Sequence, residues 1–479
     1  MEEIFENGFN YDFDEIALNG NLQKDNYNLF AASSSQYVYY VLDIGGGGAI
    51  VLLNENATSL TNSTRFIQIF SKKLLLEYPG LKYSISMMPA FDINDIKNRN
   101  QTKELNDLKN KYYLVSNIPK HGLTQDCPLN NDAAEIFNTT NSKFKNLIAH
   151  KHKGISKSAS VKLLESEMVH LDIINLLKSY NLIFSDDLSK LGQNKEGSYI
   201  AVVHIDGNGV GEFINGANTG FDFGAKSIAA QACAKNAIMK LLQEDICKNI
   251  RNGKVADEIE LEFSGSQYII PFRPLLSGGD DITFVCEGRL GMYLAEKFIE
   301  YYTDNKSIIK SACAGVAIVK TKFPFYKAYK LAEELCSEAK AKARNDGNMS
   351  SYISYYYAAD SFAGSLEQIR ERTQVYKDIK LYQGPYNLSN SITDNSLSKL
   401  KSGIKNFKDG INISNNKIQK LRELLIGSNS AKKVFIARLK ELEYQLPDEI
   451  MDDLIDNPRK LDKYFDQIEL MDFYLKTLW

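Results

Sequence analysis

Alternating and continuous runs of apolar residues predict two adjoining elements in the middle of the chain. An apolar run, Tyr199–Ile205, leads into Asp206 and a glycine-rich turn, and a helical pattern follows at residues 224–248. Further along, apolar Pro274–Leu276 leads into the turn Ser277–Asp281, and an alternating run, Ile282–Val285, leads out of it. We predict a strand before the first turn and a hairpin around the second.

The pattern continues with three more elements. Leu290–Tyr302 repeats apolar residues at helical spacing, Ala312–Val319 is continuously apolar, and Phe325–Arg344 carries an apolar helical stripe that stops near Asn345–Gly347. The order is that of a βαββαβ ferredoxin-like unit, in which the first and third strands are antiparallel neighbours. We therefore predict an α+β fold.

Acidic residues stand at both turns of this unit. Because the first and third strands are neighbours, Asp206 should lie beside Asp280 and Asp281 at one edge of the sheet. Adjacent carboxylates repel one another unless a cation neutralises them, and hard divalent metals bind such oxygens. Alone, an acidic hairpin tip is usually solvated. Together with Asp206, the pair predicts a site for two-metal nucleotidyl transfer that uses Mg²⁺ or Mn²⁺.

Residues suited to phosphate flank these acids. The turn Asn208, Gly209 and Gly211 lets backbone amides approach a phosphate closely. Lys340 and Arg344 are four residues apart, so they project from one helix face and could contact phosphate oxygens. Without the acidic motifs, a solvated helix face would be the better interpretation of these two cations.

With these motifs in place, residues 196–362 resemble the second palm domain of the large polymerase-cyclase subunit of type III CRISPR effector complexes, a relative of the GGDEF diguanylate cyclases. The resemblance rests on Val203–Gly209, Ser277–Asp281 and the helix containing Ala339 and Lys340. It implies synthesis of cyclic oligoadenylates from ATP. The implied site residues are Asp206, Asp280 and Asp281 as catalytic metal ligands, and Asn208, Gly209, Gly211, Ser277, Gly278, Gly279, Lys340 and Arg344 as nucleotide-binding residues.

The same resemblance suggests a degenerate first palm near the N-terminus. A hairpin at Tyr37–Leu53 with glycines at 45–48, a helix at Phe66–Tyr78 and a short strand at Tyr83–Met87 repeat part of the catalytic unit without its acids. The expected domains are a degenerate palm-like domain at 1–95, a linker or helical insert at 96–195, the catalytic palm at 196–362 and a C-terminal helical domain at 363–479.

Composition narrows the setting. The six cysteines have no framework spacing, which predicts reduced thiols and a cytoplasmic location. No apolar run approaches the roughly 18 residues that a membrane span needs. The net charge is −3, so no global field attracts nucleic acid.

The C-terminal region is locally asymmetric in charge. Residues 401–440 hold ten Lys or Arg against two acids, whereas residues 441–479 contain an acidic cluster. Two helical segments that neutralise each other explain this pattern, and a basic surface for nucleotide or RNA phosphates is the alternative.

Three functions remain open from the sequence. The first is a nucleotidyl cyclase of antiviral signalling that makes cyclic oligonucleotides from ATP or another nucleoside triphosphate. The second is a catalytically silent nucleotide- or RNA-binding scaffold of a CRISPR-like effector complex, and the third is a structural palm dimer. RNA, effector-complex subunits or a second copy of the chain are open as further partners. His204, on the first predicted strand, is expected to pack against the sheet.

Overall fold

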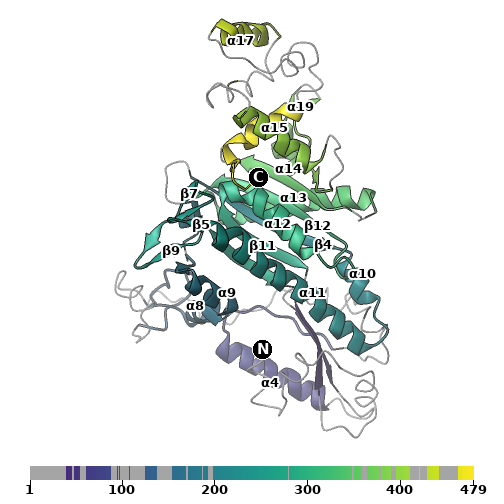
Figure 1. The fold of residues 1–479 in the computed structure, drawn as a ribbon. Helices are drawn as coiled ribbons and strands as arrows, with labels where there is room; N and C mark the ends of the chain where they lie inside the picture. Colours follow the sequence, from purple (N-terminus) through teal and green to yellow (C-terminus); the bar gives the residue numbers. More distant parts are fainter. Residues whose placement is uncertain are drawn as a thin grey trace. The chain divides into compact units, whose positions relative to one another are not determined.

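In the part of the chain that the structure describes, the fold combines helices with one six-stranded sheet and four smaller sheets (Figure 1). The computed structural model confirms the predicted α+β class. It describes residues 39–45, 48–53, 61–87, 124–137, 154–168, 171–185, 187–192, 198–278, 280–347, 350–358, 364–376, 379–389, 395–409, 429–441 and 462–478, and the single residues 94, 97, 107 and 420.

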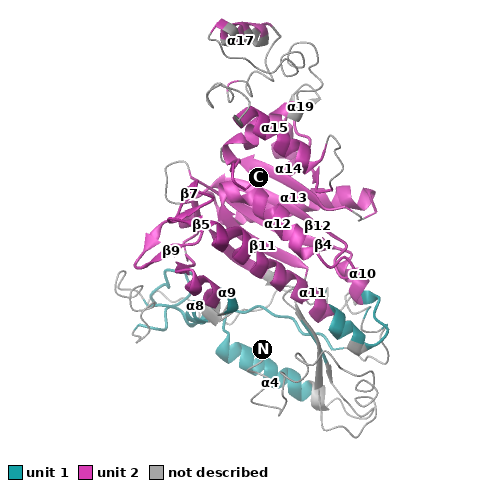
Figure 2. Cartoon of the chain, viewed as in Figure 1, with its two compact units in different colours: residues 1–44, 48–173, 215–226 teal, residues 45–47, 174–214, 227–479 magenta. Residues whose placement is uncertain are grey.

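The chain divides into two compact units (Figure 2). The first comprises residues 1–44, 48–173 and 215–226, and the second comprises residues 45–47, 174–214 and 227–479. The predicted domain boundaries differ from this division and stay predictions.

The second unit contains a six-stranded sheet in the order β10-β11-β4-β12-β13-β16. Its strands are β4 (Tyr199–Asn208), β10 (Phe272–Gly278), β11 (Asp281–Glu287), β12 (Ser311–Lys320), β13 (Tyr352–Ala358) and β16 (Tyr386–Asn387). β4 pairs antiparallel with both β11 and β12, as a ferredoxin-like unit requires. β13 extends the sheet in parallel with β12. Pro274 causes no conflict, because β10 is an edge strand and its register shifts there.

Two helices pack on opposite faces of this sheet. α12 (Gly291–Tyr302) lies against the face on which Phe284 meets Phe298. α13 (Phe325–Asn345) covers the other face, where Val202 and Leu335 share one buried cluster. α13 ends at Asn345, and Gly347 follows with a φ of +70° that suits glycine, which confirms the predicted stop.

Gly315 on β12 lets α13 come close to the sheet. A Cβ at this position would lie 2.1 Å from the carbonyl oxygen of Ala332 and 2.4 Å from the backbone nitrogen of Cys336. Since both atoms belong to the helix backbone, only glycine fits. This close approach sets the distance between α13 and the sheet, and therefore how near the α13 side chains come to the strands.

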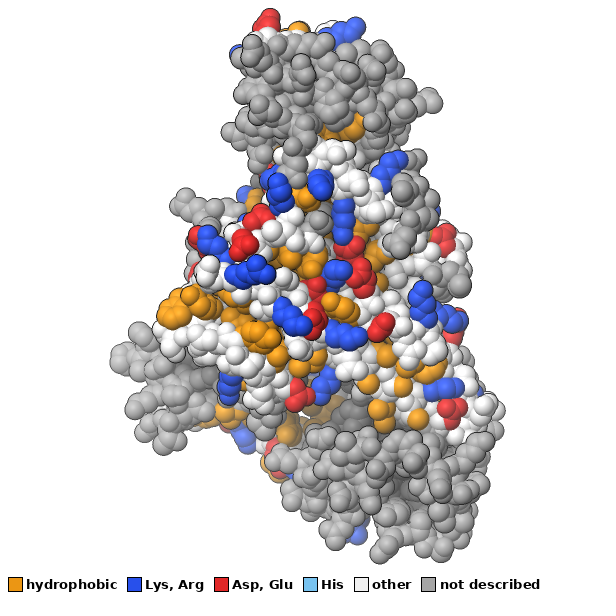
Figure 3. Space-filling model, viewed as in Figure 1, with side chains coloured by type: hydrophobic (Ala, Val, Ile, Leu, Met, Phe, Trp, Pro, Cys, Tyr) orange, Lys and Arg blue, Asp and Glu red, His pale blue; other side chains and the backbone are white. Residues whose placement is uncertain are grey.

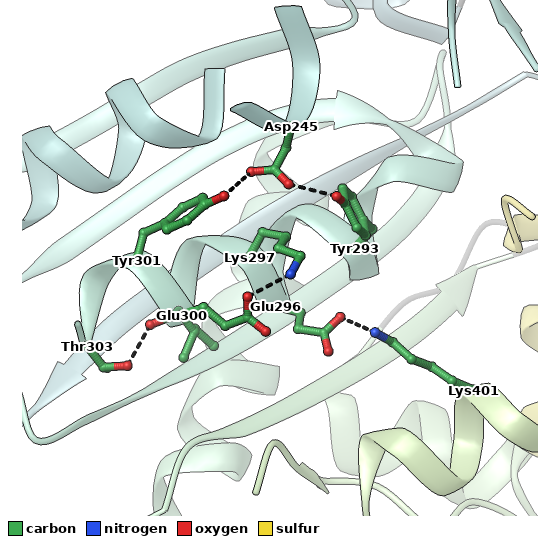
Figure 4. A network of polar contacts seen from close by, with 9 residues as sticks. Asp245, Tyr293, Glu296, Lys297, Glu300, Tyr301, Thr303 and Lys401 are labelled. Atoms are coloured by element: carbon green, nitrogen blue, oxygen red, sulfur yellow. Dashed lines mark hydrogen bonds and ion pairs between the residues drawn. The ribbon is translucent and has the colours of Figure 1, made fainter. Parts of the chain in front are cut away.

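A buried carboxylate anchors α12 from the side (Figure 4). Asp245 accepts hydrogen bonds from the hydroxyls of Tyr293 at 2.7 Å and Tyr301 at 2.8 Å. Asp245 itself belongs to a π-helical turn, Leu241–Ile246, that interrupts the predicted helix over 224–248. Glu296, also on α12, forms an ion pair with Lys401.

The remaining elements are short or lie outside the central sheet. In chain order they are α8 (Lys157–Met168), α9 (Leu171–Ser179), β3 (Leu182–Ile183), η2 (Leu188–Gly192), α10 (Val210–Asn215), α11 (Gly220–Lys240), η3 (Leu241–Ile246), η4 (Cys247–Asn249), β5 (Ile250–Arg251), β6 (Lys254–Val255), β7 (Ile259–Glu260), β8 (Phe263–Ser264), β9 (Gln267–Ile269), η5 (Gly288–Leu290), α14 (Leu366–Thr373), β14 (Val375–Tyr376), β15 (Ile379–Lys380), α15 (Leu397–Asp409), α17 (Asn429–Glu441), α19 (Asp462–Leu470) and η7 (Met471–Phe473).

Two of the three elements predicted near the N-terminus, the hairpin and the helix, are present, and the degenerate palm that they would form stays a prediction. β1 (Tyr39–Gly45) and β2 (Gly48–Leu53) form a two-stranded sheet, and α4 (Thr61–Glu77) follows. The predicted strand at Tyr83–Met87 is wrong, because residues 81–87 have no regular secondary structure. Two of the glycines, at 46 and 47, lie outside the described residues.

The basic C-terminal run is partly neutralised where the structure describes it. Lys401 on α15 pairs with Glu296, and Lys408 donates a hydrogen bond to the carbonyl of Met471 at 3.4 Å. On the face drawn in Figure 3, charges of both signs lie interspersed. These contacts favour the packing interpretation of residues 401–409.

Of the helices that the structure describes, none has the length and apolarity to cross a bilayer.

Candidate active site

Two of the three predicted acids face each other across the sheet. Asp281, at the start of β11, pairs directly with Asp206 on β4. Side chains of directly opposed residues share one face, and like charges in such a pair are destabilising. Asp280 lies in the turn, where its carbonyl accepts the backbone N–H of Gly207 at 3.3 Å. The hairpin thus brings all three acids to one end of β4.

Lys340 of α13 contacts the acid pair. Its ammonium forms an ion pair with Oδ2 of Asp206, and the two side chains are 24% and 19% exposed. This contact was not predicted, since the sequence placed Lys340 at a triphosphate. Burial raises the pKa of the Asp206 carboxyl, while the hydrogen bond and charge of Lys340 oppose that rise.

The chemistry of these residues fits a divalent cation. Oδ1 of Asp206 is buried and has no hydrogen-bond partner, which is unfavourable for a carboxylate oxygen unless an ion or water completes its environment. Asp281 is exposed and supplies further hard oxygen ligands. Among the described residues, however, no three His, Cys, Asp or Glu side chains are already gathered as a metal-binding cluster. The ion pair with Lys340 occupies the other oxygen of Asp206.

A buried polar pair lies two positions from the acid pair along β4 and β11. His204 pairs with Thr283, and its Nδ1 lies 2.9 Å from the Thr283 hydroxyl. The imidazole is 9% exposed and meets the ring of Tyr329 edge-on at 5.9 Å between centroids. His204 therefore packs against the sheet and α13, as predicted. Burial, followed by a hydrogen bond to Glu333, raises the pKa of Tyr329 to about 12.

In the turn after β4, the backbone of the glycines is open to a ligand, whereas the side chain of Asn208 is already hydrogen-bonded within the protein. Gly209 has a φ of +79°, a conformation that side chains disfavour. A Cβ on Gly211 would meet nothing within 4 Å, so open space surrounds it. Asn208 is 5% exposed, and its amide nitrogen donates to the Ser311 hydroxyl at 2.9 Å. Its side chain thus supports the sheet, and only its backbone remains a candidate phosphate contact.

The other predicted nucleotide-binding residues lie around this edge. Ser277 and Gly278 end β10, and Gly278 pairs with Asp281. Gly279 lies outside the described residues. Arg344 is exposed on α13, one turn beyond Lys340. The structure brings Lys340 to the acids and leaves Arg344 at the surface nearby.

Tyr302 is a site residue that sequence reasoning missed. Its hydroxyl is buried without a hydrogen-bond partner, and it would lie 2.9 Å from a Cβ placed on Gly207. Burial, then the charges of Asp280 and Asp206, raises the pKa of this phenol. In the sequence, Tyr302 is only the last apolar position of a predicted helix, so no local signal points to the site.

Part of the chain matches a known protein family. Residues 199–348 match the family model described as Cas10/Cmr2, second palm domain. This range contains the acid pair, the turn after β4 and the whole of α13. No curated protein shows a significant match to the chain.

Some solved structures show a distant likeness to the chain. Csm1 in T. onnurineus has a TM-score of 0.37 and 11% identity, over 90% of this chain and 61% of that one. A Csm1–Csm4 cassette in complex with cA4 has a TM-score of 0.31 and 14% identity, over 61% of this chain and 40% of that one. The chain therefore spans only part of these proteins. The family match over residues 199–348 is to the second palm domain of Cas10/Cmr2, and it confirms the palm-domain resemblance that the motifs of residues 196–362 indicate.

Proposed function

We propose that the palm domain is a nucleotidyltransferase that joins ATP into cyclic oligoadenylates. The observation that carries this proposal is the direct pairing of Asp206 with Asp281 at the strand end, with one oxygen of Asp206 buried and unpartnered. A protein gains no stability from two opposed carboxylates, so their presence calls for a cation.

Asp206, Asp280 and Asp281 would hold Mg²⁺ or Mn²⁺ in this proposal. When bound, the metal lowers the barrier by neutralising charge on the attacking and leaving oxygens. In the reaction, the 3′ oxygen of one nucleotide forms a bond to the α-phosphorus of the next. The bond from that phosphorus to the β-phosphate oxygen breaks, pyrophosphate leaves, and the hydroxyl proton passes to solvent.

The remaining residues bind the triphosphate. Lys340 reaches the acid edge, so its ammonium is placed to exchange Asp206 for phosphate oxygens when substrate enters. Arg344, exposed one turn further on, adds a second cation. The backbone amides of Gly209 and Gly211 would contact phosphate, and open space around the Cβ position of Gly211 leaves room for it.

The setting follows from the family rather than from the site. A Cas10/Cmr2-type palm suggests antiviral signalling with effector-complex subunits and RNA as partners. The six cysteines are all free, in keeping with a cytoplasmic location.

A second candidate function is a silent nucleotide- or RNA-binding scaffold. The ion pair between Lys340 and Asp206 favours it, because a lysine that neutralises the acid can replace a metal. The absence of a preformed metal cluster among the described side chains points the same way.

Product analysis distinguishes the two. The purified protein, with and without RNA activators, is incubated with Mg²⁺ or Mn²⁺ and each of the four ribonucleoside triphosphates, and products are separated and identified by mass spectrometry. We expect pyrophosphate and cyclic 3′–5′ adenylates from ATP, and no product from the variant D280A/D281A. Nucleotide binding without pyrophosphate release in every condition would support the scaffold. A guanylate product would keep the mechanism and change the substrate.

A further inference from the structure

A basic and aromatic segment joins β12 to α13. Between positions 320 and 330 the chain has four lysines and no acid, and these lysines alternate with aromatic residues. The whole chain has a net charge of −3, so this positive charge is a local feature. The lysines are Lys320, Lys322, Lys327 and Lys330.

All four lysines are exposed, and none forms an ion pair with a described residue. The acids that follow along α13 do not neutralise them. Glu334 instead accepts a hydrogen bond from the backbone N–H of Leu366 at 2.6 Å. Four uncompensated ammonium groups repel one another, and an anionic partner would relieve that repulsion.

One aromatic ring stands out from this surface. Tyr326 is 74% exposed, more than any other large hydrophobic residue that the structure describes. It shares the outer face of α13 with Lys327 and Lys330, whereas Ala328 and Leu331 are buried against the sheet. An exposed ring among cations is the arrangement on which single-stranded bases stack.

The surface is separate from the acid edge. Lys320 pairs with Tyr199 at one end of β4, and Asp206 pairs with Cys313 near the other end. The seven residue steps from Cys313 to Lys320 span about 23 Å at the rise of a strand. Lys320 therefore lies too far from Asp206 to contact a triphosphate held there, and Lys330 precedes Lys340 on α13 by ten residues, about 15 Å of helix.

We propose that Lys320, Lys322, Lys327, Lys330 and Tyr326 form a binding surface for single-stranded nucleic acid. The lysines contact successive phosphates, and the ring of Tyr326 stacks on one base. The surface offers no groups that read base edges, so binding tolerates any sequence. An anionic membrane would need a wider apolar face beside the lysines than exposed Phe325 and Tyr326 provide, since Ala328 and Leu331 are buried.

Fluorescence anisotropy with a labelled oligouridylate of about 15 nucleotides tests the proposal without nucleotide or metal. The variant K322Q/K327Q/K330Q should lose affinity, and the slope of log affinity against log salt should fall by about 2, since each phosphate contact contributes roughly 0.7. Y326A should weaken binding roughly tenfold, and Y326F should bind as the wild type does, because its ring still stacks.

A matched control removes the same charge elsewhere. K162Q/K178Q/K306Q changes three exposed lysines outside the surface and should leave binding unchanged. Equal loss in this control would overturn the proposal in favour of a general charge effect. Failure of the wild type to bind the oligonucleotide would also overturn it, as would binding only to vesicles that contain phosphatidylserine. Because the assay requires no turnover, its result is independent of the cyclase activity.

Discussion

Gly315 gives the sharpest prediction about how the site is built. The mutation G315A adds one methyl group between β12 and α13, at a position where the ideal Cβ lies 2.1 Å from the carbonyl oxygen of Ala332 and 2.8 Å from the Cβ of Leu335. Ordinary contacts of this kind lie near 3.4 Å or beyond. The helix must therefore move away by about 1 Å or the strand must bend.

The free energy of unfolding should fall by about 2 kcal/mol. Overpacking a close-packed core typically costs about 1–3 kcal/mol, and here the obstacle is rigid helix backbone rather than a flexible side chain. Replacement of glycine by alanine also restricts the unfolded chain, which returns about 0.4–1 kcal/mol. The clash exceeds that gain. The displacement should also loosen the contact of Lys340 with Asp206, because both elements position it.

Urea unfolding followed by circular dichroism measures the effect. The matched control is G211A, where a new Cβ meets nothing within 4 Å, and its unfolding midpoint should match or slightly exceed that of the wild type, because only the gain of about 0.4–1 kcal/mol applies. The reasoning would be refuted if G315A were as stable as G211A. Such a result would mean that α13 does not approach the sheet as closely as the structure places it.

Three further predictions concern charged groups. K340Q should raise KM for ATP far more than it lowers kcat, because it removes a contact to the triphosphate; a loss of kcat alone in steady-state kinetics would argue against that role. The same variant should destabilise the fold by roughly 1–2 kcal/mol, because it leaves Asp206 without its partner. Burial raises the pKa of Asp466, so its contribution to stability is present below the ordinary aspartate pKa and is lost as pH rises through the raised value. In urea unfolding across this pH interval, the free energy of unfolding of D466N should rise relative to that of the wild type. A constant difference between the two proteins across the interval would contradict this prediction. D245A should destabilise by about 3 kcal/mol or more, since two charge-assisted hydrogen bonds from α12 are lost, and a change below about 1 kcal/mol would mean that α12 is held by packing alone.

The sequence predicts the elements of the central sheet because their periodicity is strong. The helix predicted at Leu290–Tyr302 is α12 with one turn of 3-10 helix before it, and the strand predicted at Ala312–Val319 is β12 with one residue added at each end. The pairing of Asp206 with Asp281 also follows from sequence, since a ferredoxin-like order fixes which strands are neighbours.

Other features depend on contacts that no local pattern encodes. Tyr302 lies under Gly207 only because α12 crosses the end of β4, and Lys340 meets Asp206 only because Gly315 admits α13 so closely. The amide of Asn208 is engaged by Ser311, a residue about 100 positions away, which the turn motif cannot reveal. The strand register and the distance of α13 from the sheet, rather than the composition, determine these contacts.

The central claim is that the acid edge of the palm binds the catalytic metal. Anomalous scattering from crystals soaked in Mn²⁺ tests it most directly. We predict anomalous density beside Asp206, Asp280 and Asp281, with Lys340 turned away from Asp206, and none at residues 43–48, where glycines stand in place of the acids. Density at residues 43–48, or the absence of Mn²⁺ from the acid edge with Lys340 still paired to Asp206, would contradict the account.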